Sequence, residues 1–276
     1  MNGRKLSLKN LFPIVLPLQK DDEGEAAMFA KVLELTLHDL EVAYLGPPIE
    51  TGPLPAVFYF ALSARDSLML DPFNQPALFL HKHPLRIFAI TLPGHEGSLV
   101  KEQAITYWAQ HFKQGIDLLS PFVNKVCAVL HTLHKQHVLI EGKIGLMGLS
   151  RGAYLATLTA AHSTLCHHIL GFAPLTRLQA LQEFHDLSLP PSLDLSHHLD
   201  SLSSKTLRYY IGNRDLRVGT EAAFQLVTSL ANYAHKHRKR DGIFELILVQ
   251  SIGAQGHGTA LDVFQQGSDW LARCLL

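Results

Sequence analysis

The hydrophobic positions of the chain form short apolar runs that recur between longer segments with helical spacing. Residues 33–37 alternate between apolar and polar and are followed by a second apolar segment at 41–45, which predicts an antiparallel hairpin. Later runs are also predicted to be strands, and the first of them is nearly all apolar, as is typical of a strand buried on both faces of a sheet. These runs lie at residues 56–62, 85–91, 143–149, 168–173, 206–211 and 243–249.

Between these runs, apolar residues recur with the spacing of one helix face. The spacing predicts helices at 102–118, at 121–136, from 153 onward, at 220–237 and at 258–274. Pro121 is well placed to start the second of them, and Thr220 is the predicted cap of the fourth. Because strands and helices alternate after residue 85, we expect an α/β fold with a mostly parallel central sheet and helices on both faces.

Three segments depart from this alternation. Residues 63–75 are interpreted as a long polar loop. Residues 175–205 are rich in Leu, Ser, His and Pro and interrupt the alternation between two predicted strands, on the carboxyl side of the sheet. Because ligands bind at that side of such sheets, we predict that this segment is a small lid insertion over the site. Residues 1–29 are predicted to be an N-terminal extension, and residues 30–276 a single domain that contains the lid.

Composition narrows the classes of function. The 24 basic and 24 acidic residues balance, which gives no electrostatic reason to expect nucleic acid or an anionic membrane as a partner. Three cysteines without close spacing favour a reducing compartment and exclude a disulfide framework. No apolar run is long enough to span a bilayer, and the N-terminal apolar stretch is short and has no cleavage site. We therefore expect a cytoplasmic protein, although a weak export signal is left open.

The most informative motif is Gly148-Leu149-Ser150-Arg151-Gly152, which lies between a predicted strand and a predicted helix. A Gly-x-Ser-x-Gly turn at that junction raises the serine hydroxyl above the sheet and directs the first N–H groups of the helix to the same place. Both features are what a nucleophilic serine requires. The five residues alone are a weak signal, and their weight depends on the polar residues at the ends of the later strands.

Two further candidates lie on loops that leave strands. Asp215 follows the strand at 206–211, and His257, within Gly256-His257-Gly258, follows the strand at 243–249. The elbow at Ser150, followed by Asp and then His in chain order, resembles the α/β-hydrolase superfamily, in particular serine esterases and the hydrolase core of prolyl-oligopeptidase-type peptidases. The resemblance covers roughly residues 30–276 and is more specific for the fold than for any one reaction.

The resemblance implies a catalytic triad in which Ser150 is the nucleophile, His257 the general base and acid, and Asp215 the carboxylate that orients the imidazole. It also implies an oxyanion hole formed by the backbone N–H of Arg151 and by that of either Ser63 or Ala64. The loop at 92–97 is similar to a Pro-Gly-His-Gly loop of the superfamily, whose role is mainly structural. His95 on that loop is therefore not expected to be catalytic.

The other polar groups give weaker evidence of a functional site. The histidine pairs at 81/83, 167/168 and 197/198 lack metal-ligand spacing, so no metal and no cofactor are predicted. The basic run at 235–240 is interpreted as the solvated end of a helix. We also consider the hypothesis that one of Arg151, Arg214 and Arg217 binds a substrate carboxylate.

The sequence thus predicts a serine hydrolase, in the carboxylesterase class, that cleaves a small-molecule carboxylic ester or thioester through an acyl-enzyme. An amide or peptide hydrolase of the same fold is an alternative. A non-catalytic α/β-hydrolase-fold protein that binds a small molecule is a second alternative, because fold does not fix function.

Overall fold

A computed structural model describes residues 14–15, 31–97 and 101–276, and the predicted N-terminal extension therefore lies almost entirely outside the described residues. The strands are β1 (Ile14–Val15), β2 (Lys31–Leu37), β3 (Leu40–Leu45), β4 (Leu54–Phe60), β5 (Arg86–Ile90), β6 (Leu139–Leu149), β7 (His168–Phe172), β8 (Thr206–Gly212) and β9 (Ile243–Val249). The α-helices are α1 (Ala64–Met69), α2 (Gln75–Leu80), α3 (Ala104–Lys113), α4 (Leu119–Lys135), α5 (Arg151–His162), α6 (Leu199–Leu202), α7 (Thr220–Lys236) and α8 (Leu261–Leu275).

The strands form one sheet in the order β1-β2-β3-β5-β4-β6-β7-β8-β9. The first three strands pair antiparallel, and every pair from β5 and β4 through to β9 is parallel. The predicted hairpin and the mostly parallel α/β sheet are therefore confirmed. This topology brings the loops that follow β4, β6, β8 and β9 to the same edge of the sheet.

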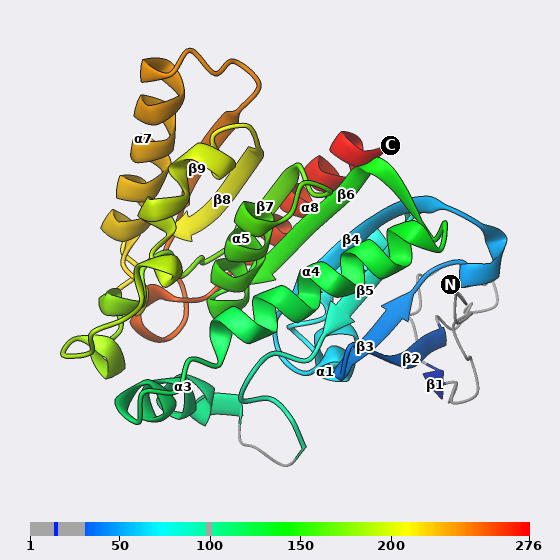
Figure 1. The fold of residues 1–276 in the computed structure, drawn as a ribbon, viewed down its shortest axis with the longest axis horizontal. Helices are drawn as coiled ribbons and strands as arrows, with labels where there is room; N and C mark the ends of the chain where they lie inside the picture. The colour runs from blue at the N-terminus through cyan, green and yellow to red at the C-terminus, as the bar shows by residue number, and fades with distance from the viewer. Residues whose placement is uncertain (1–13, 16–30, 98–100) are drawn as a thin grey trace.

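Helices cover both faces of this sheet, with α4 and α5 in front of it and α8 behind it in Figure 1. Each face has its own apolar core. One core joins residues of α3, α4, α5 and α7 to alternate positions of the strands, for example Phe58 and Leu146. The other joins α1, α2 and α8 to the opposite positions, such as Val57 and Met147. The alternation of neighbouring residues between two cores explains why the central strands are mostly apolar on both faces.

Two sets of contacts between distant parts of the chain hold the fold together. At the amino end of β5, the guanidinium of buried Arg86 donates to the carbonyl oxygens of Pro47 and Val138 at 2.9 and 2.8 Å and to Thr51 Oγ1 at 2.8 Å. These bonds fasten that end of the sheet. The last helix closes the second core, because α8 packs against α2 and Ser268 Oγ donates to the carbonyl oxygen of Pro76 at 3.1 Å.

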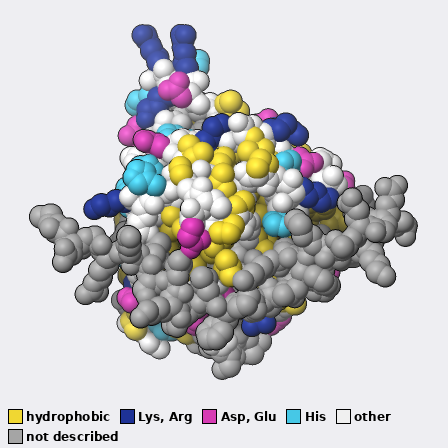
Figure 2. Space-filling view, turned by 90° about the vertical axis from the view of Figure 1, so that its right-hand side faces the viewer, with side chains coloured by type: hydrophobic (Ala, Val, Ile, Leu, Met, Phe, Trp, Pro, Cys, Tyr) yellow, Lys and Arg dark blue, Asp and Glu magenta, His cyan; other side chains and the backbone are white. Residues whose placement is uncertain are grey.

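The side of the molecule that carries β1 and β2 has hydrophobic side chains near the middle of its described surface, with charged and histidine side chains around them (Figure 2). Among the helices of the described residues, none is both long and apolar enough to cross a bilayer.

Two local predictions were wrong. The segment predicted as a long loop at 63–75 contains α1, which Ser63 caps by accepting a hydrogen bond from the N–H of Asp66. Helix α7 has Gly219 at its cap position, and Thr220 is its first helical residue. The hydroxyl of Thr220 instead forms hydrogen bonds with the backbone of Asp215 and Gly212, on the loop that carries Asp215.

The segment interpreted as a lid, 175–205, contains short 3-10 turns and α6. Most of its leucines and Phe184 are buried in the same core as α4 and α5, and Tyr154 of α5 donates to the carbonyl oxygen of Leu193 at 2.6 Å. This segment is therefore packed onto the helices beside the carboxyl edge of the sheet.

Candidate active site

Ser150 lies at a sharp turn between β6, which ends at Leu149, and α5, which begins at Arg151. Its backbone has φ 55° and ψ −119°, a strained conformation for a residue with a side chain. The surrounding backbone holds it there, because the N–H of Ser150 donates to the carbonyl of Phe172 at 2.9 Å and its own carbonyl accepts from Leu175 at 3.1 Å. These are the features of a nucleophile elbow.

The two glycines of the motif are required by close packing. A Cβ on Gly148 would lie 2.3 Å from the backbone nitrogen of Ala153, and a Cβ on Gly152 would lie 1.9 Å from the carbonyl oxygen of Phe60. Both distances are far inside van der Waals contact with rigid backbone. The sequence of the motif therefore reflects how tightly α5 is seated on the sheet.

The structure brings Ser150, His257 and Asp215 together. Ser150 Oγ lies 2.8 Å from His257 Nε2, and His257 Nδ1 lies 2.7 Å from Asp215 Oδ2. The side chain of Asp215 is 0% exposed and that of His257 is 21% exposed. A buried carboxylate paired with one imidazole nitrogen leaves the other nitrogen to accept the proton of the serine hydroxyl.

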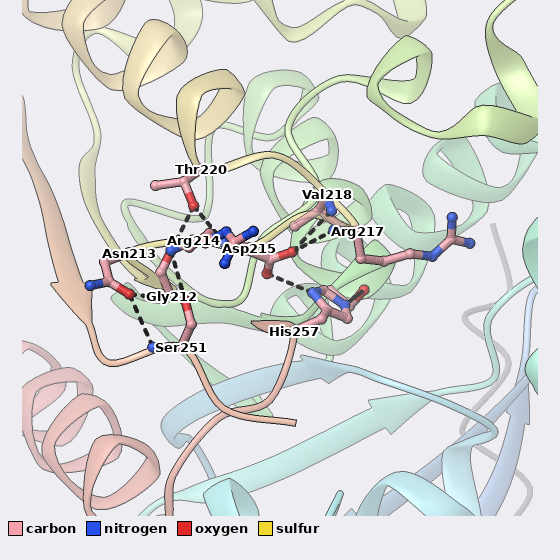
Figure 3. A network of polar contacts seen from close by, with 10 residues as sticks. Gly212, Asn213, Arg214, Asp215, Arg217, Val218, Thr220, Ser251 and His257 are labelled. Atoms are coloured by element: carbon pink, nitrogen blue, oxygen red, sulfur yellow. Dashed lines mark hydrogen bonds and ion pairs between the residues drawn. The ribbon is translucent and has the colours of Figure 1, made fainter. Parts of the chain in front are cut away.

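A polar network fixes the loop that carries Asp215 (Figure 3). The backbone N–H groups of Arg217 and Val218 donate to Asp215 Oδ1 at 3.0 and 3.1 Å. Thr220 Oγ1 accepts from the N–H of Asp215 at 2.9 Å and donates to the carbonyl of Gly212 at 2.6 Å. One carboxylate oxygen is thus held by the backbone while the other faces His257.

The loops after β8 and β9 are also tied to each other (Figure 3). Ser251 Oγ accepts from the N–H of Arg214 at 2.7 Å and donates to Asn213 Oδ1 at 3.0 Å. Because Ser251 lies on the loop that leads to His257, this contact positions the histidine relative to Asp215. The sequence pattern singled out Asp215 and His257, which the structure brings together, but it did not predict the contacts that Thr220 and Ser251 make in these loops.

The candidate oxyanion donors lie at the starts of two helices, α5 and α1. Arg151 is the first residue of α5, so its N–H belongs to the helix end that faces Ser150. The N–H of Ala64 donates to Thr91 Oγ1 at 2.9 Å and is therefore directed at the neighbouring loop. Ser63, the residue before Ala64, caps α1 with its side chain. Its backbone nitrogen therefore lies just before the first turn of α1, on the loop that follows β4.

The side chain of Arg151 is held by His95. Arg151 Nε and Nη2 lie 3.1 and 2.7 Å from His95 Nε2. A guanidinium can only donate, so this ring nitrogen of buried His95 is the acceptor and carries no proton. The loop at 92–97 thus reaches the candidate site through Arg151, a contact that the sequence did not predict because the two residues follow different strands.

Burial lowers the pKa of Arg151 to about 10, with a further lowering by the positive charge of Arg217 and an opposing effect of Glu102. Arg217 itself forms a two-pronged ion pair with Glu183 of the 175–205 segment, at 3.1 and 2.8 Å. Arg214 is exposed. The hypothesis that one of these arginines binds a substrate carboxylate stays a prediction.

The remaining histidines are spread over the structure. Within the described ranges, His, Cys, Asp and Glu side chains form no group of three that is close enough to hold a metal ion. The helix that carries the start of the basic run ends at Lys236, where His237 and the cations after it begin a turn. Most residues of the basic run at 235–240 are exposed, which supports the interpretation of this run as a solvated helix end.

Sequence comparison identifies no relatives: no protein-family model matches the chain, and no curated protein is similar enough to match it. Solved structures do match it at the level of the fold. A cold-adapted esterase from an Arctic intertidal metagenomic library has a TM-score of 0.61 at 14% identity, with 94% of this chain and 100% of that chain covered. The S-formylglutathione hydrolase from Agrobacterium tumefaciens has a TM-score of 0.59 at 13% identity, with 90% and 95% covered.

A third similar structure is prolyl oligopeptidase B from Galerina marginata, with a TM-score of 0.63 at 15% identity. The match covers 88% of this chain but 36% of that one, so the present chain spans about a third of the length of the peptidase. All three sequence identities are so low that the similarity shows a shared fold and not a shared reaction. With the sheet order, the helices on both faces and the turn at Ser150, it establishes that this chain has the α/β-hydrolase fold.

Proposed function

We propose that this protein is a serine hydrolase that acts through an acyl-enzyme. The observation that carries the proposal is the continuous chain of short contacts from Ser150 through His257 to buried Asp215. A serine hydroxyl is a weak nucleophile until a neutral imidazole takes its proton, and the imidazole needs a carboxylate to fix its tautomer. The resemblance to solved hydrolases supports the general class.

In the acylation step, Ser150 Oγ attacks the substrate carbonyl carbon while its proton passes to His257 Nε2. The carbonyl electrons move onto oxygen, and the resulting imidazolium is stabilised by Asp215. His257 then protonates the leaving group as the carbonyl re-forms, which leaves an ester on Ser150. Water, deprotonated by the same imidazole, attacks this ester, releases the acid and returns the proton to Ser150.

The negative charge that develops on the carbonyl oxygen requires two donors. We assign them to the backbone N–H groups of Arg151 and Ser63. Ala64 is the less suitable of the two alternatives on the loop after β4, because its N–H donates to Thr91 Oγ1. One such donor contributes about 3 kcal/mol to transition-state stabilisation.

For the substrate we propose a small-molecule carboxylic ester or thioester. Similarity to an esterase and to an S-formylglutathione hydrolase, each covered over almost its whole length, favours this class. Similarity to prolyl oligopeptidase B favours amide or peptide hydrolysis as a second candidate, but this chain corresponds to only 36% of that enzyme.

The first experiment is labelling with a fluorophosphonate probe, followed by peptide mass spectrometry. We expect a single adduct on Ser150 and none in Ser150→Ala. His257→Asn should remain folded and label far more slowly, because the serine then lacks its base. A folded wild-type protein that is not labelled would contradict the proposal.

A substrate series separates the two candidate classes. Esters, thioesters and amides with the same acyl group are compared by kcat/KM on the wild type, with Ser150→Ala as the blank. Faster turnover of the esters and thioesters supports the first candidate, after correction for their higher intrinsic reactivity. Cleavage of the amides at a comparable kcat/KM would support the peptidase candidate instead.

A further inference from the structure

Strand β9 is an edge of the sheet whose outer side is left open within the described part of the chain. None of its residues, from Ile243 to Val249, is fully buried, whereas its neighbour β8 is mostly buried. The two most exposed residues of β9 are both large and apolar, Leu248 at 57% and Ile243 at 55%. Phe224 of α7, the helix that packs against β9, is exposed as well.

Edge strands of monomeric proteins usually have a feature that prevents pairing with another chain, such as a lysine, a proline, a bulge or a short length. The sequence of β9, Ile-Phe-Glu-Leu-Ile-Leu-Val, contains neither lysine nor proline. It pairs with β8 in unbroken register from Thr206↔Ile243 to Gly212↔Val249, so it has no bulge. Its single charge, Glu245, is already engaged by Arg208 of β8 at 2.7 Å.

We propose that β9 is the interface of a symmetric dimer, in which it pairs antiparallel with β9 of a second copy of this chain. A twofold axis at Leu246, the middle of the strand, places Ile243 opposite Val249 and Phe244 opposite Leu248 of the other copy. Each exposed apolar side chain then meets an apolar partner on the same face of the joined sheet. Glu245 lies opposite Ile247, so no like charges meet.

The flanking helix fits the same symmetry. Helix α7 lies at the β9 end of the sheet (Figure 1), and the twofold axis makes the two α7 helices antiparallel. Its first turn carries exposed Glu221, and its last turn carries exposed His235 and Lys236. The acidic end of each helix therefore lies at the same end of the interface as the basic end of the other, which is electrostatically favourable.

The loops that carry Asp215 and His257 leave β8 and β9 at the carboxyl end, but the interface runs along the length of β9. The proposal therefore does not depend on the proposed hydrolase activity. It is tested on the full chain without substrate.

The test measures molar mass by light scattering and sedimentation equilibrium over a range of protein concentrations. The wild type should have twice the 30.6 kDa mass of the chain at the upper concentrations. Leu248→Lys and Ile243→Lys should both give the mass of one chain, because a lysine at either end of the strand meets an apolar partner and weakens self-association by about 100-fold or more. Ile116→Lys is the matched control, since Ile116 is 48% exposed but lies between α3 and α4, and it should remain a dimer.

Circular dichroism and thermal unfolding establish that the three variants are equally folded. Amide hydrogen exchange within β9 provides a second measurement, and it should be faster in Leu248→Lys than in Ile116→Lys because the outward-facing N–H groups lose their partners. A wild type that has the mass of a single chain at every concentration would overturn the proposal. A dimer that persists in either β9 variant would overturn it too.

Discussion

The two halves of the candidate active site are built in different ways. Ser150 lies at the centre of the sheet, and its position is fixed by backbone contacts and by the space that two glycines leave for α5. Asp215 and His257 lie on loops after the last two strands, beside an exposed edge, and are fixed by hydrogen bonds from side chains and loop backbone.

The difference indicates which substitutions separate folding from activity. A change at the serine half alters the seating of a helix on the sheet, so it acts on the stability of the whole fold. A change at the acid–base half can retain shape and remove one polar function. Four substitutions, in order of expected effect, test this contrast.

The largest effect on activity with the fold intact is expected for Asp215→Asn. An amide cannot hold the imidazole in the tautomer that accepts the serine proton, and such a change lowers kcat by about 10⁴-fold in serine proteases. Ester turnover and fluorophosphonate labelling measure the loss, and circular dichroism checks the fold. Asp262→Asn, an exposed carboxylate on α8, is the control and should retain full activity. An Asp215→Asn variant with near wild-type turnover would exclude the assigned role.

Gly152→Ala should reduce stability by about 3 kcal/mol or more, because its methyl group would overlap the Phe60 carbonyl and force α5 away from the sheet. Chemical denaturation measures the change in the free energy of unfolding. Gly145→Ala, on β6, is the matched control: its Cβ would meet the end of the flexible Leu271 side chain at 2.9 Å, so its cost should be smaller. Equal effects of the two substitutions would mean that the backbone contact at Gly152 is unimportant.

Thr220→Val removes the hydroxyl that bridges Asp215 and Gly212 while keeping the shape of the side chain. We expect stability to fall by about 1–2 kcal/mol, since a part-buried N–H loses its acceptor, and turnover to fall by about 10-fold. Thr220→Ser retains the hydroxyl and should behave like the wild type. If both variants lose the same activity, the loss of the hydroxyl and its hydrogen bonds would not be the cause.

The smallest effect concerns Glu183, whose pKa is lowered from its ordinary value of 4.5 by hydrogen bonds from Arg217. A lowered pKa in the folded state stabilises the protein above the pKa of the unfolded state, and this contribution is lost as the pH falls through the folded value. Glu183→Gln should therefore cost about 0.5–1 kcal/mol near pH 7, since the pair is partly exposed, and the difference should disappear at acidic pH.

Unfolding of Glu183→Gln and of the wild type is compared at both pH values. Asp186→Asn, an exposed carboxylate in the same segment, serves as the control and should be neutral at both. A stability difference for Glu183→Gln that persists unchanged at low pH would mean that charge is not its cause.

The sequence predicted the strands and long helices well because each is a local pattern. Runs such as 169–173 are apolar because neighbouring residues face two different cores, as Ile169 and Leu170 do, and the Gly-x-Ser-x-Gly motif is a local consequence of close packing. The chain order of Ser, Asp and His also allowed residues far apart in the chain to be grouped from the sequence alone.

Short elements and contacts between distant loops could not be predicted in this way. Helix α1 has six residues, too few to establish a periodicity, and Ser63 with Asp66 was its only local signal. The support of Asp215 by Thr220 and the contact between His95 and Arg151 depend on side-chain directions that packing determines. The segment 175–205 was recognised as a departure from the pattern, but its turns have no periodicity to predict.

The packing of α8 against α2 has a consequence for how this chain folds. Ser268 and Pro76, which are joined by a hydrogen bond, are 192 positions apart in the sequence. One of the two cores therefore stays incomplete until the last helix has been synthesised, and contacts of such long range slow folding. The second face of the sheet is exposed to solvent during that interval, so we expect a nascent chain that lacks α8 to depend on chaperones.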